Sequence, residues 1–123
     1  MASKILIVDD DLDLRELYKK TLSNEGFEVR TAEDGEEALS QIMQDRPDLI
    51  VLDIMMPKIH GMDTLDIIKA TPETKEIKVL ILSALSDKKM MDRAKELGVV
   101  DYVVKSQSDM ATVIDHIKEA LKS

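Results

Sequence analysis

Residues 4–11 read Lys4-Ile5-Leu6-Ile7-Val8-Asp9-Asp10-Asp11, an apolar run that stops at three carboxylates. A second run, Leu49-Ile50-Val51-Leu52, stops at Asp53 in the same way. Short continuous apolar runs are typical of strands buried on both faces, as in a parallel sheet. If the two strands are parallel neighbours, their carboxyl ends lie side by side. Asp9, Asp10 and Asp53 then converge on one small patch.

Such a patch is electrostatically costly, because like charges at close range repel and raise one another's pKa. A cation would relieve the repulsion, and Mg²⁺ is a hard ion that prefers oxygen ligands. Two further strand ends add to the patch, since the run at 79–82 leads into Ser83 and the run at 102–104 leads into Lys105. Sites in open α/β sheets form outside the carboxyl ends of the strands. We therefore expect a functional site where these four ends meet.

Strand and helix patterns alternate five times along the chain. We expect strands at about 4–8, 27–31, 49–52, 79–82 and 102–105, and helices at about 12–24, 36–45, after 61, 87–97 and from Ser108, the expected N-cap. Single helices between strands favour crossover connections and a parallel sheet with helices on both faces. Polar and apolar residues alternate in 27–31, which favours an edge position for that strand. The fold class is therefore α/β, a doubly wound five-stranded parallel sheet, and we expect residues 1–123 to form a single domain.

The spacing of apolar residues predicts which helix faces lie against the sheet. The residues expected to face inward are Leu14, Leu17, Tyr18, Thr21 and Leu22 in the first helix, Ala38, Leu39, Ile42 and Met43 in the second, Met62, Leu65 and Ile68 in the third, and Met110, Val113, Ile114, Ile117 and Leu121 in the fifth.

Composition excludes several classes of function. The 123 residues carry 17 basic and 25 acidic side chains, a net charge of −8, which disfavours non-specific binding to nucleic acid and to anionic membranes. One Phe, two Tyr and no Trp offer few platforms for base stacking. The chain has no Cys and no apolar run of membrane-spanning length. Residues 1–4 lead straight into a short expected strand, so we expect no signal peptide. We expect a cytoplasmic protein with no direct nucleic-acid or membrane partner.

The strand-end residues, taken together and in this order, resemble the receiver domain of bacterial two-component response regulators. The resemblance covers residues 4–121 and is closest to the single-domain chemotaxis-regulator type. Its markers are Asp9-Asp10, Asp53 with Pro57 four residues on, Ser83-Ala84 and Lys105. The resemblance implies a flavodoxin-like (βα)5 fold with the strand order 2-1-3-4-5.

The resemblance also implies roles for the acidic residues. Asp53 would be the phosphoacceptor, taking a phosphoryl group from the phosphohistidine of a histidine kinase or a histidine phosphotransfer protein. Mg²⁺ would be held by Asp10, Asp53 and the backbone carbonyl of Met55, with Asp9 acting through a metal-bound water. Elementary chemistry agrees, since a carboxylate nucleophile forms an acyl phosphate and phosphoryl transfer depends chiefly on positioning and on neutralised charge.

The remaining markers are implied to bind the phosphoryl group and to report its presence. Ser83, Ala84 and Lys105 would contact the phosphoryl oxygens. Ser83 and Tyr102 would together switch a protein-binding surface made by the fourth helix, the fifth strand and the fifth helix, where a downstream target protein would bind.

Two departures from the family pattern affect these expectations. Ser106 follows Lys105, where the family usually has proline, often after a cis bond. A cis bond before a residue other than proline costs about 3 kcal/mol, so we expect a trans bond or a strained loop. Met55 and Leu85 are large and apolar at the positions that flank the path of the hydrolytic water in the family. We therefore expect slow loss of the phosphoryl group.

Several interpretations stay open beside a stand-alone regulator. The chain could be a phosphorelay intermediate, the receiver fragment of a longer regulator, or a pseudo-receiver that binds partners without phosphorylation. A metal-dependent phosphatase with an Asp nucleophile would need a second Asp two residues later, where this chain has Met55. Apart from its own phosphorylation and dephosphorylation, we expect no enzymatic activity.

Overall fold

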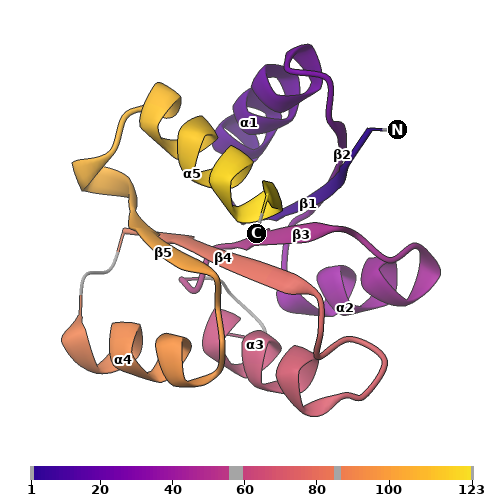
Figure 1. Cartoon of the computed structure of the whole chain (residues 1–123), viewed down its shortest axis with the longest axis vertical. Helices are drawn as coiled ribbons and strands as arrows, with labels where there is room; N and C mark the ends of the chain where they lie inside the picture. The colour runs from indigo at the N-terminus through magenta and orange to yellow at the C-terminus, as the bar shows by residue number, and fades with distance from the viewer. Residues whose placement is uncertain (1, 56–59, 85–86, 123) are drawn as a thin grey trace.

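In the computed structural model, which describes residues 2–55, 60–84 and 87–122, five parallel strands form one sheet in the order β2-β1-β3-β4-β5 (Figure 1). The strands are β1 (Lys4–Val8), β2 (Glu28–Ala32), β3 (Leu49–Leu52), β4 (Lys78–Ser83) and β5 (Asp101–Val104). The helices are α1 (Leu12–Asn24), α2 (Gly35–Gln44), α3 (Gly61–Ala70), α4 (Lys88–Glu96) and α5 (Met110–Lys122), and a 3-10 turn, η1 (Lys105–Gln107), follows β5. The fold class and the strand order expected from the sequence are confirmed, and β2 lies at an edge of the sheet.

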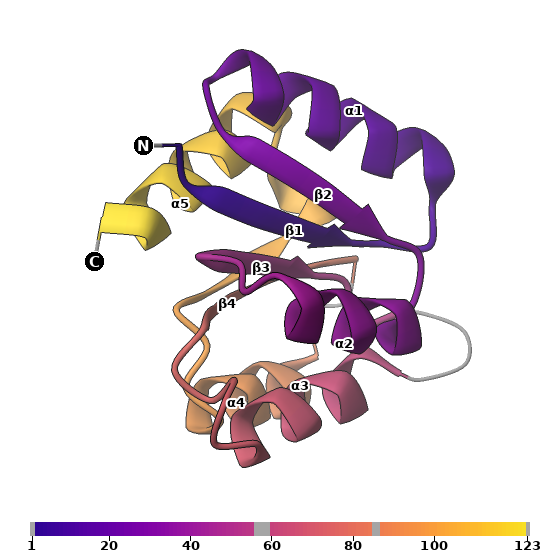
Figure 2. The same ribbon diagram turned by 90° about the vertical axis from the view of Figure 1, so that its right-hand side faces the viewer.

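The sheet is covered by helices on both faces. Helices α1 and α5 lie on one face, and α2, α3 and α4 lie on the other (Figures 1 and 2). Side chains of a strand alternate between the two faces, so Leu6 and Val8 of β1 join the core under α2, α3 and α4, while Ile5 and Ile7 join the core under α1 and α5. The central strands need apolar residues at every position for this reason. None of the described helices is long and apolar enough to cross a membrane.

The register of the central strands determines where the site forms. Val8 pairs with Leu52, so β1 and β3 end at the same level of the sheet. The backbone N–H of Asp53 donates to the Val8 carbonyl at 2.9 Å, which holds the two strand ends together. The first residues past both strands are Asp9 and Asp53, and their side chains therefore emerge next to each other.

Some expected details are wrong. Leu17 and Met43 were expected to face inward, but they are 48% and 65% exposed. Helix α1 buries a narrower face around Tyr18 and Leu22, and α2 buries a narrower face around Ala38 and Ile42. Helix α5 begins at Met110, and the backbone N–H of Thr112 donates to the Asp109 carboxylate at 2.8 Å. Asp109 therefore caps this helix in place of Ser108, because η1 and the residues after it delay the start of α5.

Helix α3 provides a direct test of the packing. Ile68 is completely buried, whereas its neighbour Ile67 is 43% exposed. Ile68→Ala should lower the free energy of unfolding by about 2–5 kcal/mol, because it leaves a cavity in the core. Ile67→Ala makes the same chemical change on the outer face and should cost less than about 0.5 kcal/mol. Urea denaturation measures both, and equal losses would contradict this placement of α3.

Candidate functional site

The turn that follows β1 carries two of the acidic residues and starts α1. The Asp9 side chain is buried, and its Oδ1 accepts a hydrogen bond from the backbone N–H of Asp11 at 3.0 Å. Asp11 in turn caps α1, because its carboxylate accepts from the backbone N–H of Leu14 at 3.2 Å. A short polar network thus orders the chain where the strand becomes a helix.

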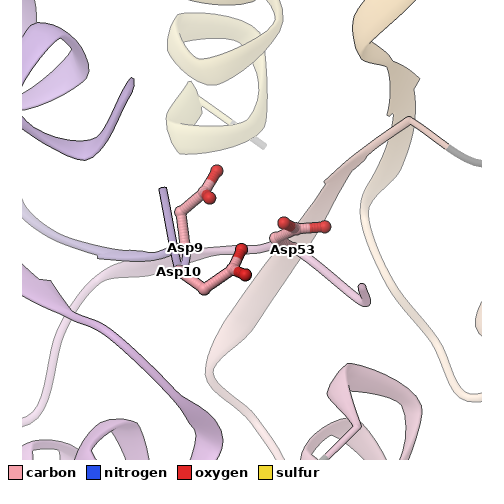
Figure 3. Close-up of side chains that lie close together, drawn as sticks. All are labelled: Asp9, Asp10 and Asp53. Carbon is pink, nitrogen blue, oxygen red and sulfur yellow. The ribbon is translucent and has the colours of Figure 1, made fainter. Parts of the chain in front are cut away.

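The three carboxylates converge as the strand ends predict. Asp9, Asp10 and Asp53 each offer an oxygen, and these oxygens lie within 4.8 Å of one another. Figure 3 shows Asp10 reaching from the end of β1 toward Asp53 at the end of β3. Asp9 and Asp53 are buried and Asp10 is exposed, so the cluster opens to solvent on the Asp10 side.

Lys105 brings one positive charge into this acidic cluster from η1. Its Nζ donates to Asp9 Oδ2 at 2.8 Å and to Asp53 Oδ2 at 3.4 Å. None of the described peptide bonds is cis, so the bond between Lys105 and Ser106 is trans. The trans outcome, one of the two expected, still delivers the ammonium to both carboxylates.

The shared ammonium does not compensate the carboxylates equally. Burial raises the pKa of Asp53 above its usual 3.8, and the Asp9 charge raises it further, although the Met55 N–H and Lys105 oppose the rise. Burial alone would lower the pKa of Lys105, but hydrogen bonds and attraction from Asp9 and Asp53 outweigh it and raise that pKa. The Lys105 ammonium lies closer to Asp9 than to Asp53. It therefore offsets only part of the free-energy cost of burying the charged form of Asp53, and the pKa of Asp53 stays raised.

Ser83 and Tyr102, the two residues expected to act as a switch, lie on the neighbouring strands β4 and β5, where Ser83 ends β4 and Tyr102 pairs with Ile81. Ser83 is completely buried. Because Leu52 pairs with Ile81, Ser83 lies one residue further toward the carboxyl edge of the sheet than Asp53. Burial raises the pKa of the half-buried Tyr102 hydroxyl, and a side-chain hydrogen bond with Ser83 opposes that rise. Ala84 is exposed next to Ser83.

The backbone after β3 also contributes to the site. The Met55 N–H donates to Asp53 Oδ1 at 3.0 Å, and the Met55 side chain is exposed. The family marker Pro57 and the expected water-flanking residue Leu85 lie outside the described residues.

Two residues near the site were missed at the sequence level. A Cβ on Gly61 would lie 2.3 Å from the Ile54 Cα and 2.5 Å from the Asp53 carbonyl oxygen, so only glycine lets α3 start against the end of β3. Arg15 donates from Nη1 to the Asp9 carbonyl at 2.8 Å. The position of Gly61 at the start of a helix was a usable signal, whereas no sequence pattern marked Arg15.

The acidic cluster fits a hard divalent cation. Among the described residues, three carboxylates and one ammonium leave a charge of −2 when all are ionised, which one divalent ion neutralises. No described group donates a hydrogen bond to the Asp10 carboxylate, so its oxygens are available as ligands. Asp10, Asp53 and the Met55 carbonyl each offer an oxygen as a metal ligand, the type of ligand that Mg²⁺ prefers.

A parallel α/β sheet with this arrangement of carboxylates and lysine at its carboxyl edge defines the receiver class of domains. The family model of the response regulator receiver domain matches residues 5–118, and the chain belongs to that family. The transcriptional regulatory protein CpxR of Escherichia coli K12 is 43% identical over 111 residues, which cover 90% of this chain and 46% of CpxR. The probable transcriptional regulator ycf27 of Cyanophora paradoxa is 42% identical over 102 residues, covering 83% of this chain and 41% of that protein. The chain thus spans less than half the length of these curated relatives.

Solved structures of receiver domains have the same fold. The Vibrio cholerae chemotaxis protein CheY4 superposes with a TM-score of 0.89 at 28% identity, covering 98% of this chain and 99% of CheY4. The non-phosphorylated receiver domain of HemR from Leptospira biflexa gives a TM-score of 0.91 at 26% identity, covering 98% and 95%. The chain is therefore similar over nearly its whole length both to a chemotaxis protein and to a receiver domain.

The burial of Asp53 has a consequence for stability in the absence of metal. Because the folded-state pKa of Asp53 lies above its unfolded value, folding is favoured while Asp53 is protonated, and this stabilisation is lost as the pH rises through the folded pKa. Asp53→Asn has nothing to ionise, so in EDTA at pH 7 it should be more stable than the wild type. The difference should shrink as the pH falls toward 3.8. Urea titrations at several pH values measure it, and a variant that is less stable at pH 7 would contradict this account.

Proposed function

We propose that this chain is the phosphoacceptor module of a two-component system. Asp53 takes a phosphoryl group from the phosphohistidine of a histidine kinase or of a histidine phosphotransfer protein. The observation that carries the proposal is the Lys105 ammonium placed between Asp9 and Asp53, at a cluster of carboxylates open to solvent beside Asp10. A cluster that served stability alone would not keep at its centre a buried carboxylate whose charge the neighbouring cation only partly offsets.

The residues then have distinct tasks in the transfer. An Asp53 oxygen attacks phosphorus and forms the acyl phosphate, while the bond between phosphorus and the histidine nitrogen breaks and its electron pair returns to the imidazole. The Met55 N–H on Oδ1 orients the Asp53 carboxylate. Lys105, held by Asp9, pairs with a phosphoryl oxygen, and Ser83 and Ala84 contact another. Mg²⁺, bound by Asp10, Asp53 and the Met55 carbonyl with Asp9 acting through water, would supply the remaining positive charge.

The phosphoryl group would be sensed by the surface formed by α4, β5 and α5. Ser83 shifts toward the new oxygens, and Tyr102, which is hydrogen-bonded to Ser83, follows. Helix α4 can respond, because Ala94 is the only fully buried residue among its nine. Beside Tyr102 lies a depression of about 430 Å³, bordered by Met91 and Lys95 of α4 and by Val100. We propose that a downstream target protein binds there in a phosphorylation-dependent manner.

The relatives support two alternatives for the position of the module within its pathway. Two of the curated relatives are named as transcriptional regulators and are more than twice as long as the matched segment, which favours a receiver within a longer regulator. CheY4, a chemotaxis protein that the chain matches almost from end to end, favours a stand-alone regulator. A phosphorelay intermediate is a further candidate, and we propose a cytoplasmic location for either. The complete acidic set and Lys105 disfavour a pseudo-receiver. We propose no enzymatic activity beyond phosphorylation and dephosphorylation of Asp53.

Phosphorylation by a small donor tests this function. Acetyl phosphate with Mg²⁺ should add one phosphoryl group to the wild type, as seen by intact mass, and none to Asp53→Asn. Asp34→Asn is the matched control, because Asp34 is as buried as Asp53 but caps α2 outside the cluster, and Asn caps a helix equally well. Equal labelling of wild type and Asp53→Asn would refute the assignment.

The switch has a separate test by amide NMR. Beryllofluoride, a phosphoryl mimic, should shift signals at residues 90–97 and 102–104 as well as those around Asp53. In Ser83→Ala the distant shifts should shrink markedly, because the hydroxyl that couples the site to Tyr102 is gone. If the wild-type shifts stayed within the loops around Asp53, the site would bind phosphate without switching a surface.

A further inference from the structure

We propose that Arg15 is a positioning residue for the metal site and that it orients Asp10 toward the ion. The proposal rests on the proposed function, since it concerns Mg²⁺ binding at the same cluster. Arg15 is not a ligand in this account. It acts through the backbone of the turn between β1 and α1, which spans only Asp9, Asp10 and Asp11.

Asp9 is held at all of its polar groups. Its backbone N–H donates to the Ala32 carbonyl at 3.1 Å. Its two carboxylate oxygens accept from the Asp11 N–H and from Lys105. Its carbonyl accepts from Arg15 Nη1 at 2.8 Å. The Arg15 bond is therefore the contact that fixes the direction of the Asp9 carbonyl.

The direction of the Asp9 carbonyl determines the position of the Asp10 Cα. The peptide bond is planar, so the Asp9 carbonyl, the Asp10 nitrogen and the Asp10 Cα lie in one plane. A rotation of this plane would move the Asp10 carboxylate relative to Asp53. By holding the carbonyl oxygen, Arg15 fixes the plane and with it the origin of the Asp10 side chain.

Asp10 needs this support more than the other two acids do. It is exposed, and no described group hydrogen-bonds to its carboxylate, whereas Asp9 and Asp53 are buried and bonded to Lys105. Repulsion from these two neighbours favours an outward orientation of Asp10 when no ion is bound. The backbone is thus the structural element that keeps Asp10 close to the cluster. The Arg15 backbone N–H also donates to the Asp11 carbonyl at 2.9 Å, so α1 itself anchors the arginine.

Positioning and simple electrostatics predict opposite results. Arg15 carries a positive charge near a cation site, so removing it would strengthen Mg²⁺ binding if charge alone mattered. If Arg15 positions a ligand, removing it should weaken binding, and loss of such outer contacts typically costs metal sites about 10- to 100-fold in affinity. The sign of the change therefore separates the two effects.

The experiment is an Mg²⁺ titration of the full 123-residue chain, followed by calorimetry and by the amide signals of Asp10 and Asp53. Arg15→Met keeps the aliphatic stem but loses the donor, and we expect its dissociation constant to rise about tenfold. Arg15→Ala should behave in the same way. Arg15→Lys, which restores a donor, should bind Mg²⁺ more tightly than Arg15→Met.

Arg30 provides a matched control. It also donates to backbone carbonyls, those of Gln41 and Asp45 at 3.1 and 3.0 Å, but outside the cluster. Arg30→Met should change the Mg²⁺ affinity by less than about twofold. Unchanged or tighter binding by Arg15→Met, or equal weakening in the two variants, would overturn the role of Arg15. A wild type that binds no Mg²⁺ would instead contradict the proposed function.

Discussion

The pairing of Val8 with Leu52 is the constraint on which the functional site depends. Because β1 and β3 are parallel and end at one level, the residues that follow them place three carboxylates within 4.8 Å of one another. The Lys105 ammonium faces this charge. The arrangement is unfavourable in isolation, since two of the acids are buried. The other features of the site either reduce the free-energy cost of this buried charge or make the charge available to a cation.

The supporting contacts come from elements that are far apart in the sequence. The Met55 N–H holds Asp53, the Arg15 guanidinium holds the turn after β1, and Lys105 arrives from beyond β5. Gly61 lets α3 begin against the backbone of Asp53. The same core that packs both faces of the sheet therefore fixes the geometry of the acids. The burial that raises the pKa of Asp53 is part of this geometry, and a bound cation would convert an unfavourable charge into a ligand.

Most of the fold and the main site residues could be predicted from the sequence, because strand ends in a parallel sheet meet at one edge. The runs that end at Asp9 and Asp53 were sufficient to place the acidic cluster, and the alternation of elements was sufficient for the fold class. Exposure of Leu17 and Met43 could not be predicted, since periodicity defines a helix face but not how wide a stripe the sheet covers. The contact of Arg15 with the Asp9 carbonyl depends on side-chain direction, which no residue pattern encodes.

The central claim is that the convergent carboxylates of β1 and β3 bind a divalent cation. Paramagnetic Mn²⁺ tests it most directly, because it broadens the amide signals nearest to the bound ion. Broadening should begin at residues 9–11 and 53–55 and should be reversed by excess Mg²⁺. Broadening that begins instead at the acidic segment 33–37, or that Mg²⁺ does not reverse, would contradict the account.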